Sequence, residues 1–380
     1  MQTNLNNFGS EEGHDVIRLD LDSYTDTTYS THNIHPYPAK FIPQIPREII
    51  SKYSAEDEWV LDPFCGSGTT LLEAKLNGRN AIGIDVNPIS CLISRTKTTA
   101  LTNRDREIVE KLLSVIQEDI QSGEHYDTPE YYNVDYWVQE HVQSELSVIK
   151  HQVEKCDVER VRDFMFTAMS AIFTKVSNQE SDTRYKSIDK DIGQYEVWSQ
   201  FSNHVSEMLQ QNRELKNLCT DSDTLVLNED IQDVNMPEQP IDLVVTSPPY
   251  PNSYDYYLYH KHRMFWLGFN PKDVQEKEFG SRYKHNDRGE GLETYIVPME
   301  NAVQKIANKL RKGRRFVVVV GDAILDGELI EMNVVLDNIF DKFGYEKEFE
   351  FRFDQRKYTR SFTPNYRKMK KNSYLLVYRL

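Results

Sequence analysis

Residues 62–70 read DPFCGSGTT and follow a short apolar run at residues 59–61. Glycines in such a loop let a ligand approach the backbone and tolerate a positive φ, because they carry no Cβ. Asp85 lies 19 residues beyond Gly66, where a carboxylate can accept hydrogen bonds from both hydroxyls of a ribose. The pattern predicts a nucleoside cofactor. The chain has no GxxxxGK[ST] and no third glycine of the dinucleotide fingerprint, which argues against a triphosphate cradle and an NAD enzyme.

Residues 247–250 read SPPY and follow a second apolar run, Ile241–Thr246. Two prolines fix φ and remove two N–H donors, so the carbonyls there become rigid acceptors. Ser247 adds a hydroxyl acceptor, and Tyr250 adds a flat face that can stack on a base. An aryl amine is a poor nucleophile, and two acceptors that grip its N–H bonds favour a reactive, pyramidal nitrogen. Two prolines can simply end a strand, but beside the glycine loop they predict methylation of an amino group.

Together the two segments resemble the amino-methylating DNA methyltransferases. The TSPPY form at residues 246–250 is more similar to the cytosine-N4 enzymes than to the adenine-N6 enzymes, which more often carry DPPY. HPYPAKF at residues 35–41 resembles the family segment that covers the methionine end of the cofactor, and residues 313–323 resemble a later core strand. The resemblance implies S-adenosylmethionine as cofactor, double-stranded DNA as substrate and a companion restriction endonuclease as partner.

The resemblance also implies roles for individual residues. Asp85 would hold the ribose, Asn87 and Asp230 would lie near the adenine, and Tyr250 would stack on a base flipped out of the duplex. Flipping is needed because the amino group is buried in base pairing. The catalytic set is Ser247, Pro248, Pro249 and Tyr250. The cofactor-binding set is Pro38, Lys40, Phe41, Asp62, Pro63, Phe64, Cys65, Gly66, Ser67, Gly68, Thr69, Asp85, Asn87 and Asp230, and no metal site is expected.

Strand, glycine loop, helix and strand in this order predict an α/β fold with a doubly wound sheet. We expect a Rossmann-like class I methyltransferase fold, with a mostly parallel seven-stranded sheet, an antiparallel C-terminal strand pair and an inserted helical subdomain. Four prolines within residues 36–46 rule out a regular helix before about Arg47. The expected strands are residues 59–61, 80–85, 223–227, 241–246, 315–320, 347–353 and 373–379.

The chain divides into three predicted parts. Residues 1–30 form a polar lead-in, residues 31–100 and 223–380 form the catalytic domain, and residues 101–222 form an inserted, mostly helical subdomain. Apolar residues recur at helical spacing in the insert, over residues 104–120, 138–153 and 163–176. This subdomain is a candidate for target recognition.

The net charge of −15 is unevenly distributed. Residues 260–380 hold 24 Lys and Arg against 17 Asp and Glu, and a polyanion needs only a local basic face. Two regions compete as the target-recognition surface: residues 251–293, where aromatics alternate with cations, and the polar segment at residues 177–190. The predicted DNA-binding residues are Lys261, Arg263, Arg282, Lys284, Arg356 and Arg360.

Several alternatives remain open at this point. The nearest is the same chemistry at adenine N6. A protein of another class, a catalytically inactive, cofactor-sensing DNA-binding protein, predicts a damaged glycine loop or tetrapeptide, and both are intact. Carbon-5 methylation of cytosine needs a cysteine nucleophile, and none of the four cysteines follows a proline. Four scattered cysteines, no apolar run of 18 residues and no signal peptide predict a cytoplasmic protein without a membrane partner.

Overall fold

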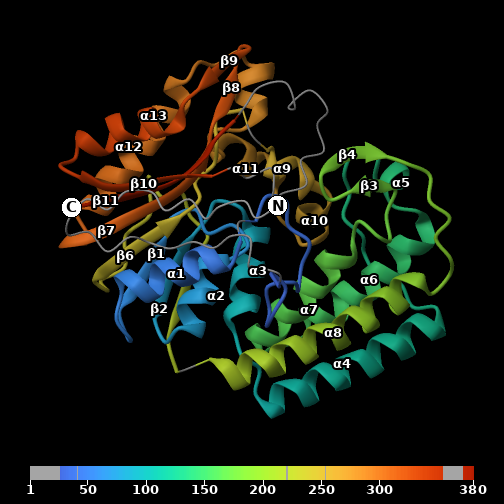
Figure 1. The fold of residues 1–380 in the computed structure, drawn as a ribbon. Coiled ribbons are helices and arrows are strands. Elements are labelled where there is room, and N and C mark those ends of the chain that lie inside the picture. Colours follow the sequence, from blue (N-terminus) through green and yellow to red (C-terminus); the bar gives the residue numbers. More distant parts are fainter. Residues whose placement is uncertain (1–25, 41, 220, 253, 354–370) are drawn as a thin grey trace, which may run out of the picture.

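A central sheet of seven strands organises the chain (Figure 1). The strand order is β10-β11-β7-β6-β1-β2-β5. The computed structural model describes residues 26–40, 42–219, 221–252, 254–353 and 371–380. The strands are β1 (Trp59–Asp62), β2 (Asn80–Ile84), β5 (Thr224–Leu227), β6 (Ile241–Thr246), β7 (Leu310–Gly321), β10 (Glu346–Phe353) and β11 (Ser373–Arg379).

The strand directions confirm the predicted fold class. Neighbours from β5 to β7 run parallel, whereas β11 is antiparallel to both β7 and β10. Leu61 of β1 lies opposite Ile82 on one side and Val244 on the other. The middle residues of these strands are apolar because helices cover both faces of the sheet.

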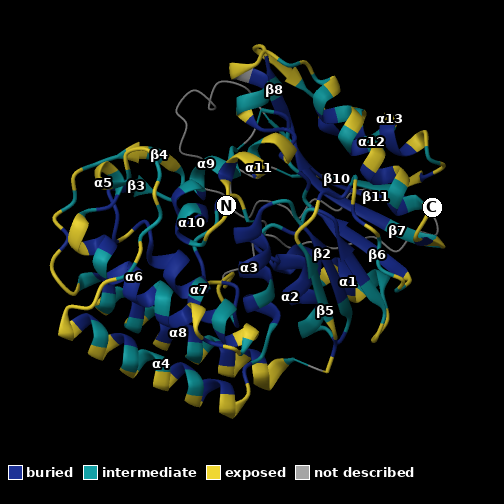
Figure 2. Ribbon diagram, turned by 180° about the vertical axis from the view of Figure 1, so that it is seen from behind, coloured by how far each residue is buried: buried dark blue, intermediate teal, exposed yellow. Residues whose placement is uncertain are grey.

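Alternate side chains of each strand enter two separate cores. Val244 and Val318 belong to the core under α12 and α13, whereas Leu243 and Val317 belong to the core under α1 and α2. This alternation is the period of two that a pleated strand imposes. Figure 2 shows the resulting buried sheet between exposed helix faces. The covering helices are α1 (Gln44–Tyr53), α2 (Thr69–Leu76), α12 (Glu293–Ala307) and α13 (Met332–Asp341).

Helix α1 begins at Gln44, three residues before the predicted start at Arg47. Pro46 lies in its first turn, where a backbone N–H has no partner within the helix. The prediction was wrong because a proline is tolerated in that position. The predicted polar lead-in is described only from Asp26, and Ser30 at its end is buried.

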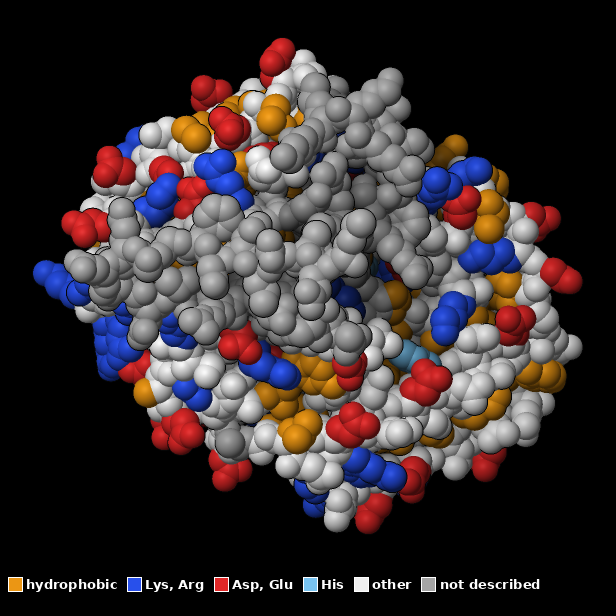
Figure 3. Space-filling view, viewed as in Figure 1, with side chains coloured by type: hydrophobic (Ala, Val, Ile, Leu, Met, Phe, Trp, Pro, Cys, Tyr) orange, Lys and Arg blue, Asp and Glu red, His pale blue; other side chains and the backbone are white. Residues whose placement is uncertain are grey.

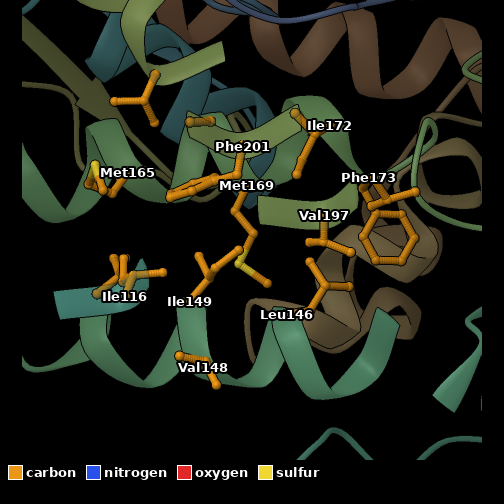
Figure 4. Close-up of a cluster of buried hydrophobic side chains, with 14 of the residues drawn as sticks. Ile116, Leu146, Val148, Ile149, Met165, Met169, Ile172, Phe173, Val197 and Phe201 are labelled. Carbon is orange, nitrogen blue, oxygen red and sulfur yellow. The ribbon is translucent and has the colours of Figure 1, made fainter. Parts of the chain in front are cut away.

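Residues 103–218 form helices around a separate hydrophobic core, part of which Figure 4 shows. Phe201 of α8 and Met169 of α7 meet Ile149 of α6 in that core. Helix α7 also joins α3 through an ion pair between Arg95 and Asp163, with Nε and Oδ2 2.6 Å apart. The elements are α3 (Pro88–Thr98), α4 (Asn103–Ser122), α5 (Val134–Trp137), α6 (Glu140–Glu154), α7 (Glu159–Ile172), β3 (Gln179–Ser181), β4 (Arg184–Ser187) and α8 (Glu196–Leu218).

Short helices after β6 lie between the sheet and the helical insert (Figure 1). Trp266 from this segment is buried in the core of the insert. Within the described ranges, no helix combines the length and apolar character needed to cross a membrane. The remaining elements are α9 (Tyr256–Tyr259), α10 (Lys261–Trp266), α11 (Pro271–Lys277), the π-helical turn η2 (Tyr283–Asp287), β8 (Ala323–Leu325) and β9 (Glu328–Ile330).

Candidate active site

A pocket opens at the carboxyl ends of β5, β2, β1 and β6. It encloses about 1100 Å³, including solvent at its mouth. The chain leaves β1 toward β2 on one side and later returns to β6 on the other, and ligands of doubly wound sheets bind at such a switch point. We call the lining residues at these strand ends the strand wall: Asp62, Pro63, Phe64, Cys65, Gly66, Ser67, Thr69, Asp85, Val86, Asn87, Glu229, Asp230, Ile231, Ser247, Pro248, Pro249 and Tyr250.

The segment after β6 supplies the opposite side of the pocket. We call its lining residues, Tyr254, Tyr256, Lys277, Glu278 and Phe279, the helix wall. Tyr37, Ala39 and Lys40, from the segment before α1, complete the lining.

The glycine loop is fixed against α3. Gly68 has a φ of +73°, and a Cβ added there would meet Ser94 Oγ at 2.7 Å. The Ser94 hydroxyl also donates to the Gly66 carbonyl at 2.8 Å. The loop therefore needs glycine at position 68 both for its conformation and for the close approach of α3.

Asp62 joins the two motifs. Its Oδ1 accepts a hydrogen bond from Thr246 Oγ1 at 2.7 Å and another from the Phe64 N–H at 3.2 Å. Asp62 ends β1 and Thr246 ends β6, so the glycine loop and the SPPY segment start from adjacent, bonded positions. Burial raises the pKa of Asp62 to about 6.

Asp85 holds the ends of β1 and β2 together. Its Oδ2 accepts from the Gly66 N–H, and its Oδ1 accepts from the Asn87 N–H, each at 2.8 Å. Burial raises its pKa to about 6, against the effect of these two bonds. Each carboxylate oxygen keeps a further lone pair that can accept a ligand hydroxyl.

The SPPY segment enters the pocket directly from the buried strand β6. Ser247 Oγ lies 3.3 Å from the hydroxyl of Tyr250, and Pro248 is buried. Gly280, just beyond the helix wall, packs on this segment: with a φ of +75°, its absent Cβ would lie 2.8 Å from the Tyr250 carbonyl oxygen. The position of the SPPY backbone therefore depends on a glycine 30 residues away in the chain.

The helix wall carries a buried carboxyl group. Glu278 accepts hydrogen bonds from the N–H groups of Tyr256 at 3.1 Å and Tyr257 at 3.4 Å. Burial raises its pKa well above the ordinary value, and the neighbouring Asp255 and Asp85 act in the same direction. These bonds fix the start of α9 and the orientation of the tyrosines that face the pocket.

Aromatic contacts join the two walls to each other and to the segment before α1. Tyr37 stacks on Tyr256 with centroids 5.5 Å apart, and Phe64 meets Phe279 edge-on at 5.4 Å. The Tyr37 hydroxyl is 2.8 Å from Ser90 Oγ of α3. The pocket is thus closed on two sides by residues from three distant parts of the chain.

Most of the predicted site residues gather in this pocket. All four of the catalytic set line it, from Ser247 to Tyr250. Of the cofactor-binding set, Pro38 and Gly68 lie outside the lining, and Phe41 falls outside the described residues. The members that line it are Lys40, Asp62, Pro63, Phe64, Cys65, Gly66, Ser67, Thr69, Asp85, Asn87 and Asp230.

The predicted DNA-binding residues do not form one group. Arg263 is only 1% exposed, and it donates to the Ser170 carbonyl and to Thr174 Oγ1 and pairs with Asp182. The prediction of Arg263 as a DNA-binding residue was therefore wrong, because the side chain is enclosed by the insert. Arg282 is exposed, while Lys261 and Lys284 are half-buried. Arg356 and Arg360 lie outside the described residues.

Sequence reasoning missed most of the helix wall. Tyr254 and Tyr256 belong to the aromatic segment that it assigned to a nucleic-acid face, whereas Glu278 and Phe279 belong to no motif. Tyr37 lies within the HPYPAKF segment and was also overlooked. No local pattern marks these residues, because long-range packing brings them to the pocket.

Parts of the chain are similar to known DNA methylases. The family model of a DNA methylase family, N6_N4_Mtase, matches residues 10–95. The chain is 30% identical over 253 residues to the type II methyltransferase M.MvaI of Kocuria varians, which covers 60% of this chain and 55% of that protein. It is 26% identical over 294 residues to the type II methyltransferase M.BsoBI of Geobacillus stearothermophilus, which covers 65% and 54%. The chain thus spans about half the length of these relatives.

Among solved structures, the chain is similar to the rRNA methyltransferase aviRa from Streptomyces viridochromogenes. The TM-score is 0.37 and the identity 10%, over 90% of this chain and 88% of that one. A likeness at this level carries no argument about what the chain acts on.

Proposed function

We propose that this chain is an S-adenosylmethionine-dependent DNA methyltransferase that methylates the N4 amino group of cytosine. The observation that carries the proposal is the meeting of the glycine loop and the SPPY segment in one pocket, through the bond between Asp62 and Thr246. The match of residues 10–95 to a DNA methylase family and the type II methyltransferase relatives support the same activity.

The residues of the strand wall fit this cofactor. Asp85 offers two carboxylate oxygens for ribose hydroxyls at the end of β2. Asn87 lies beside it, and within the described structure its buried Nδ2 has no hydrogen-bond partner, as expected of a group that receives a ligand acceptor. Asp230 lines the same end of the pocket, and the glycine loop provides space for the methionine group. S-adenosylmethionine supplies a methyl group made electrophilic by its sulfonium.

The SPPY segment would hold the base whose amino nitrogen gains the methyl group and loses one proton. Ser247 Oγ and the Pro248 carbonyl would accept the two N–H bonds, and Tyr250 would stack on the flipped ring. Ser247 stands where adenine-N6 enzymes more often carry an aspartate, which favours cytosine N4.

The helical insert and the helix wall together suit target recognition. Arg263 of α10 pairs with Asp182, between β3 and β4, and the Lys261 ammonium lies 5.5 Å from the centre of the Tyr185 ring. The two regions that competed in the sequence are therefore one continuous surface beside the pocket. Figure 3 shows Lys and Arg side chains, with acidic ones among them, over the hairpin side of this face. We propose duplex DNA as the partner of this surface, and a restriction endonuclease as the companion activity.

The test is a methylation assay with the purified chain, methyl-labelled cofactor and unmodified duplex DNA, followed by digestion to nucleosides and mass spectrometry. N4-methylcytosine is the expected product. N6-methyladenine would overturn the choice of base, and the absence of any methylated nucleoside would overturn the proposed activity.

The variants Ser247→Ala and Tyr250→Ala should each lower the rate by at least about 100-fold, since they remove positioning groups. Val334→Ala, which alters a side chain that is 49% exposed on α13, outside the insert and the pocket, is the control and should leave the rate unchanged. Wild-type rates in both pocket variants would contradict the assigned roles.

A further inference from the structure

Glu278 is a buried glutamate on the helix wall, and it belongs to no motif. Its exposed fraction is 7%, and its carboxylate oxygens accept hydrogen bonds from the N–H groups of Tyr256 and Tyr257 at the start of α9. Among the described residues no cation forms an ion pair with it, and Lys277, which precedes it in the chain, is exposed. A buried carboxylate normally has a cationic partner, because an isolated charge is costly to bury.

The titratable groups around Glu278 make its negative charge still more costly. Burial has the largest effect, and the carboxyl groups of Asp255, before α9, and Asp85, at the end of β2, act in the same direction. The hydroxyls of Tyr37 and Tyr256 are also close enough to interact with it. Burial and the two carboxyl groups raise the pKa of Glu278 well above its ordinary value, so the neutral acid is favoured unless a positive charge lies nearby.

Glu278 faces the part of the pocket where a methyl group would be transferred. Asp85, the acceptor proposed for the ribose, and Tyr250, proposed to stack on the base, mark the two ends of that path. Tyr256 lies close enough to Asp85, to Tyr250 and to Glu278 to interact with their charges. The sulfur of the cofactor carries both the ribose and the methyl group, so it must lie between the two ends. It is positively charged in S-adenosylmethionine and neutral in S-adenosylhomocysteine.

The aromatic rings beside Glu278 suit the same cation. Tyr37 stacks on Tyr256 with centroids 5.5 Å apart, and Phe279, the next residue in the chain, meets Phe64 edge-on at 5.4 Å. All four of these residues line the pocket. A sulfonium has no N–H or O–H group to donate, so negative charge and ring faces stabilise it instead of hydrogen bonds. A carboxylate beside aromatic rings supplies both.

We infer that Glu278 is the counter-ion of the methyl-transfer centre: it is a carboxylate when a sulfonium lies opposite it and a neutral acid when the neutral thioether product does. This inference rests on the proposed function. When the sulfonium binds, one O–H bond of Glu278 breaks and the proton passes to solvent. After transfer the sulfur is neutral, the target nitrogen has lost one proton and the carboxylate takes one up. The single proton of the overall reaction therefore leaves when the cofactor binds, and the loss of charge pairing after transfer favours release of the product.

Two ligands that differ only at the sulfur test this role. The experiment is calorimetric titration of S-adenosylmethionine and S-adenosylhomocysteine into wild type and Glu278→Gln at neutral pH. Titrations in phosphate and in Tris, whose ionisation enthalpies differ, measure the protons released. Wild type should release about one proton more with S-adenosylmethionine than with S-adenosylhomocysteine. Glu278→Gln should abolish this difference, weaken S-adenosylmethionine about tenfold and change S-adenosylhomocysteine less than about twofold, since only the first ligand carries the sulfonium.

Glu276→Gln is the matched control, because Glu276 lies two residues earlier on α11, is 61% exposed and pairs with Arg288 outside the pocket lining. It should leave both affinities and the proton release unchanged. Equal proton release with the two ligands in wild type, a comparison that needs no variant, would overturn the inference. Equal losses of affinity for the two ligands in Glu278→Gln, or no loss for either, would overturn it as well. Failure of wild type to bind either ligand would instead count against the proposed function.

Discussion

The two walls of the pocket are held in place by different parts of the molecule. The strand wall continues directly from β1, β2 and β6, whose side chains are almost entirely buried in the sheet. The segment that carries the helix wall follows β6 in the chain, but its helix α10 is anchored in the helical insert through Arg263 and Trp266. Neighbouring strands therefore position the residues of the strand wall. The helix wall is instead positioned by contacts between residues more than 80 positions apart in the sequence.

This difference shows that the insert has a structural role at the pocket. It supports the segment that closes the pocket, so that the proposed target-recognition surface and the wall of the pocket share one structural element. Three changes test whether the walls are independently held.

The largest expected effect is on stability, at the junction between the insert and the helix wall. Arg263→Met removes the partner of Asp182 and three further hydrogen bonds, to the Ser170 and Tyr259 carbonyls and to Thr174 Oγ1. Breaking a buried ion pair in this way should lower the free energy of unfolding by about 3–5 kcal/mol, measured by urea denaturation.

Arg184→Met is its control, because Arg184 is 61% exposed and pairs with Glu180, four residues earlier in the β3–β4 hairpin. It should cost less than about 0.5 kcal/mol. Similar losses in both variants would mean that the insert does not hold the helix wall.

The next effect concerns the strand wall alone. Asp85→Asn removes the negative charge of the carboxylate that accepts hydrogen bonds from the N–H groups of Gly66 and Asn87. The same carboxylate is the acceptor proposed for the ribose hydroxyls. Loss of charge-assisted hydrogen bonds should weaken S-adenosylhomocysteine binding about 100-fold in calorimetry. Asp242→Asn is the control: this carboxylate is even more buried than the half-buried Asp85, but it pairs with Arg311 at the opposite end of β6, so the affinity should not change.

The pH dependence gives an independent check on Asp85. The ionised carboxylate is the better acceptor, and burial raises its pKa to about 6, so protonation below that value removes the acceptor. The affinity for S-adenosylhomocysteine should therefore fall roughly fourfold between pH 7 and pH 5.5. Asp62 also has a pKa raised to about 6, so a slope that persists unchanged in Asp85→Asn would assign the effect to Asp62 instead.

The smallest effect concerns the contact between the walls. Gly280→Ala places a Cβ 2.8 Å from the Tyr250 carbonyl oxygen, which must shift the SPPY backbone. Misplacing the acceptors should lower kcat about tenfold and leave KM for the cofactor nearly unchanged.

Gly268→Ala separates this contact from backbone strain. Gly268 has a φ of +80°, close to the +75° of Gly280, but a Cβ there would meet nothing within 4 Å. Both variants should lose about 1 kcal/mol of stability from the left-handed conformation, and only Gly280→Ala should lose turnover. An equal loss of turnover in the two would show that strain, not contact between the walls, is responsible.

The sequence predicted one wall and not the other. Residues 241–246 form a strand with the bounds that their apolar pattern predicts. The acceptor groups of residues 247–250 lie at the end of this strand, so the sequence alone predicts where they are. Glu278 lies in no motif, and Arg263 looked like a surface cation in a basic segment. Their environments depend on which residues lie opposite them, and this information is absent from the local pattern.

By itself, the sequence determined the sheet and the strand wall. Apolar runs, glycines and prolines act within a few residues of themselves, so their positions fix strands, tight loops and the groups at strand ends. Only the tertiary structure decided the helix wall, the burial of Arg263 and the position of Glu278 against the start of α9. These depend on how α7, α9, α10 and the β3–β4 hairpin pack together, because burial and pairing are set by neighbours distant in the chain.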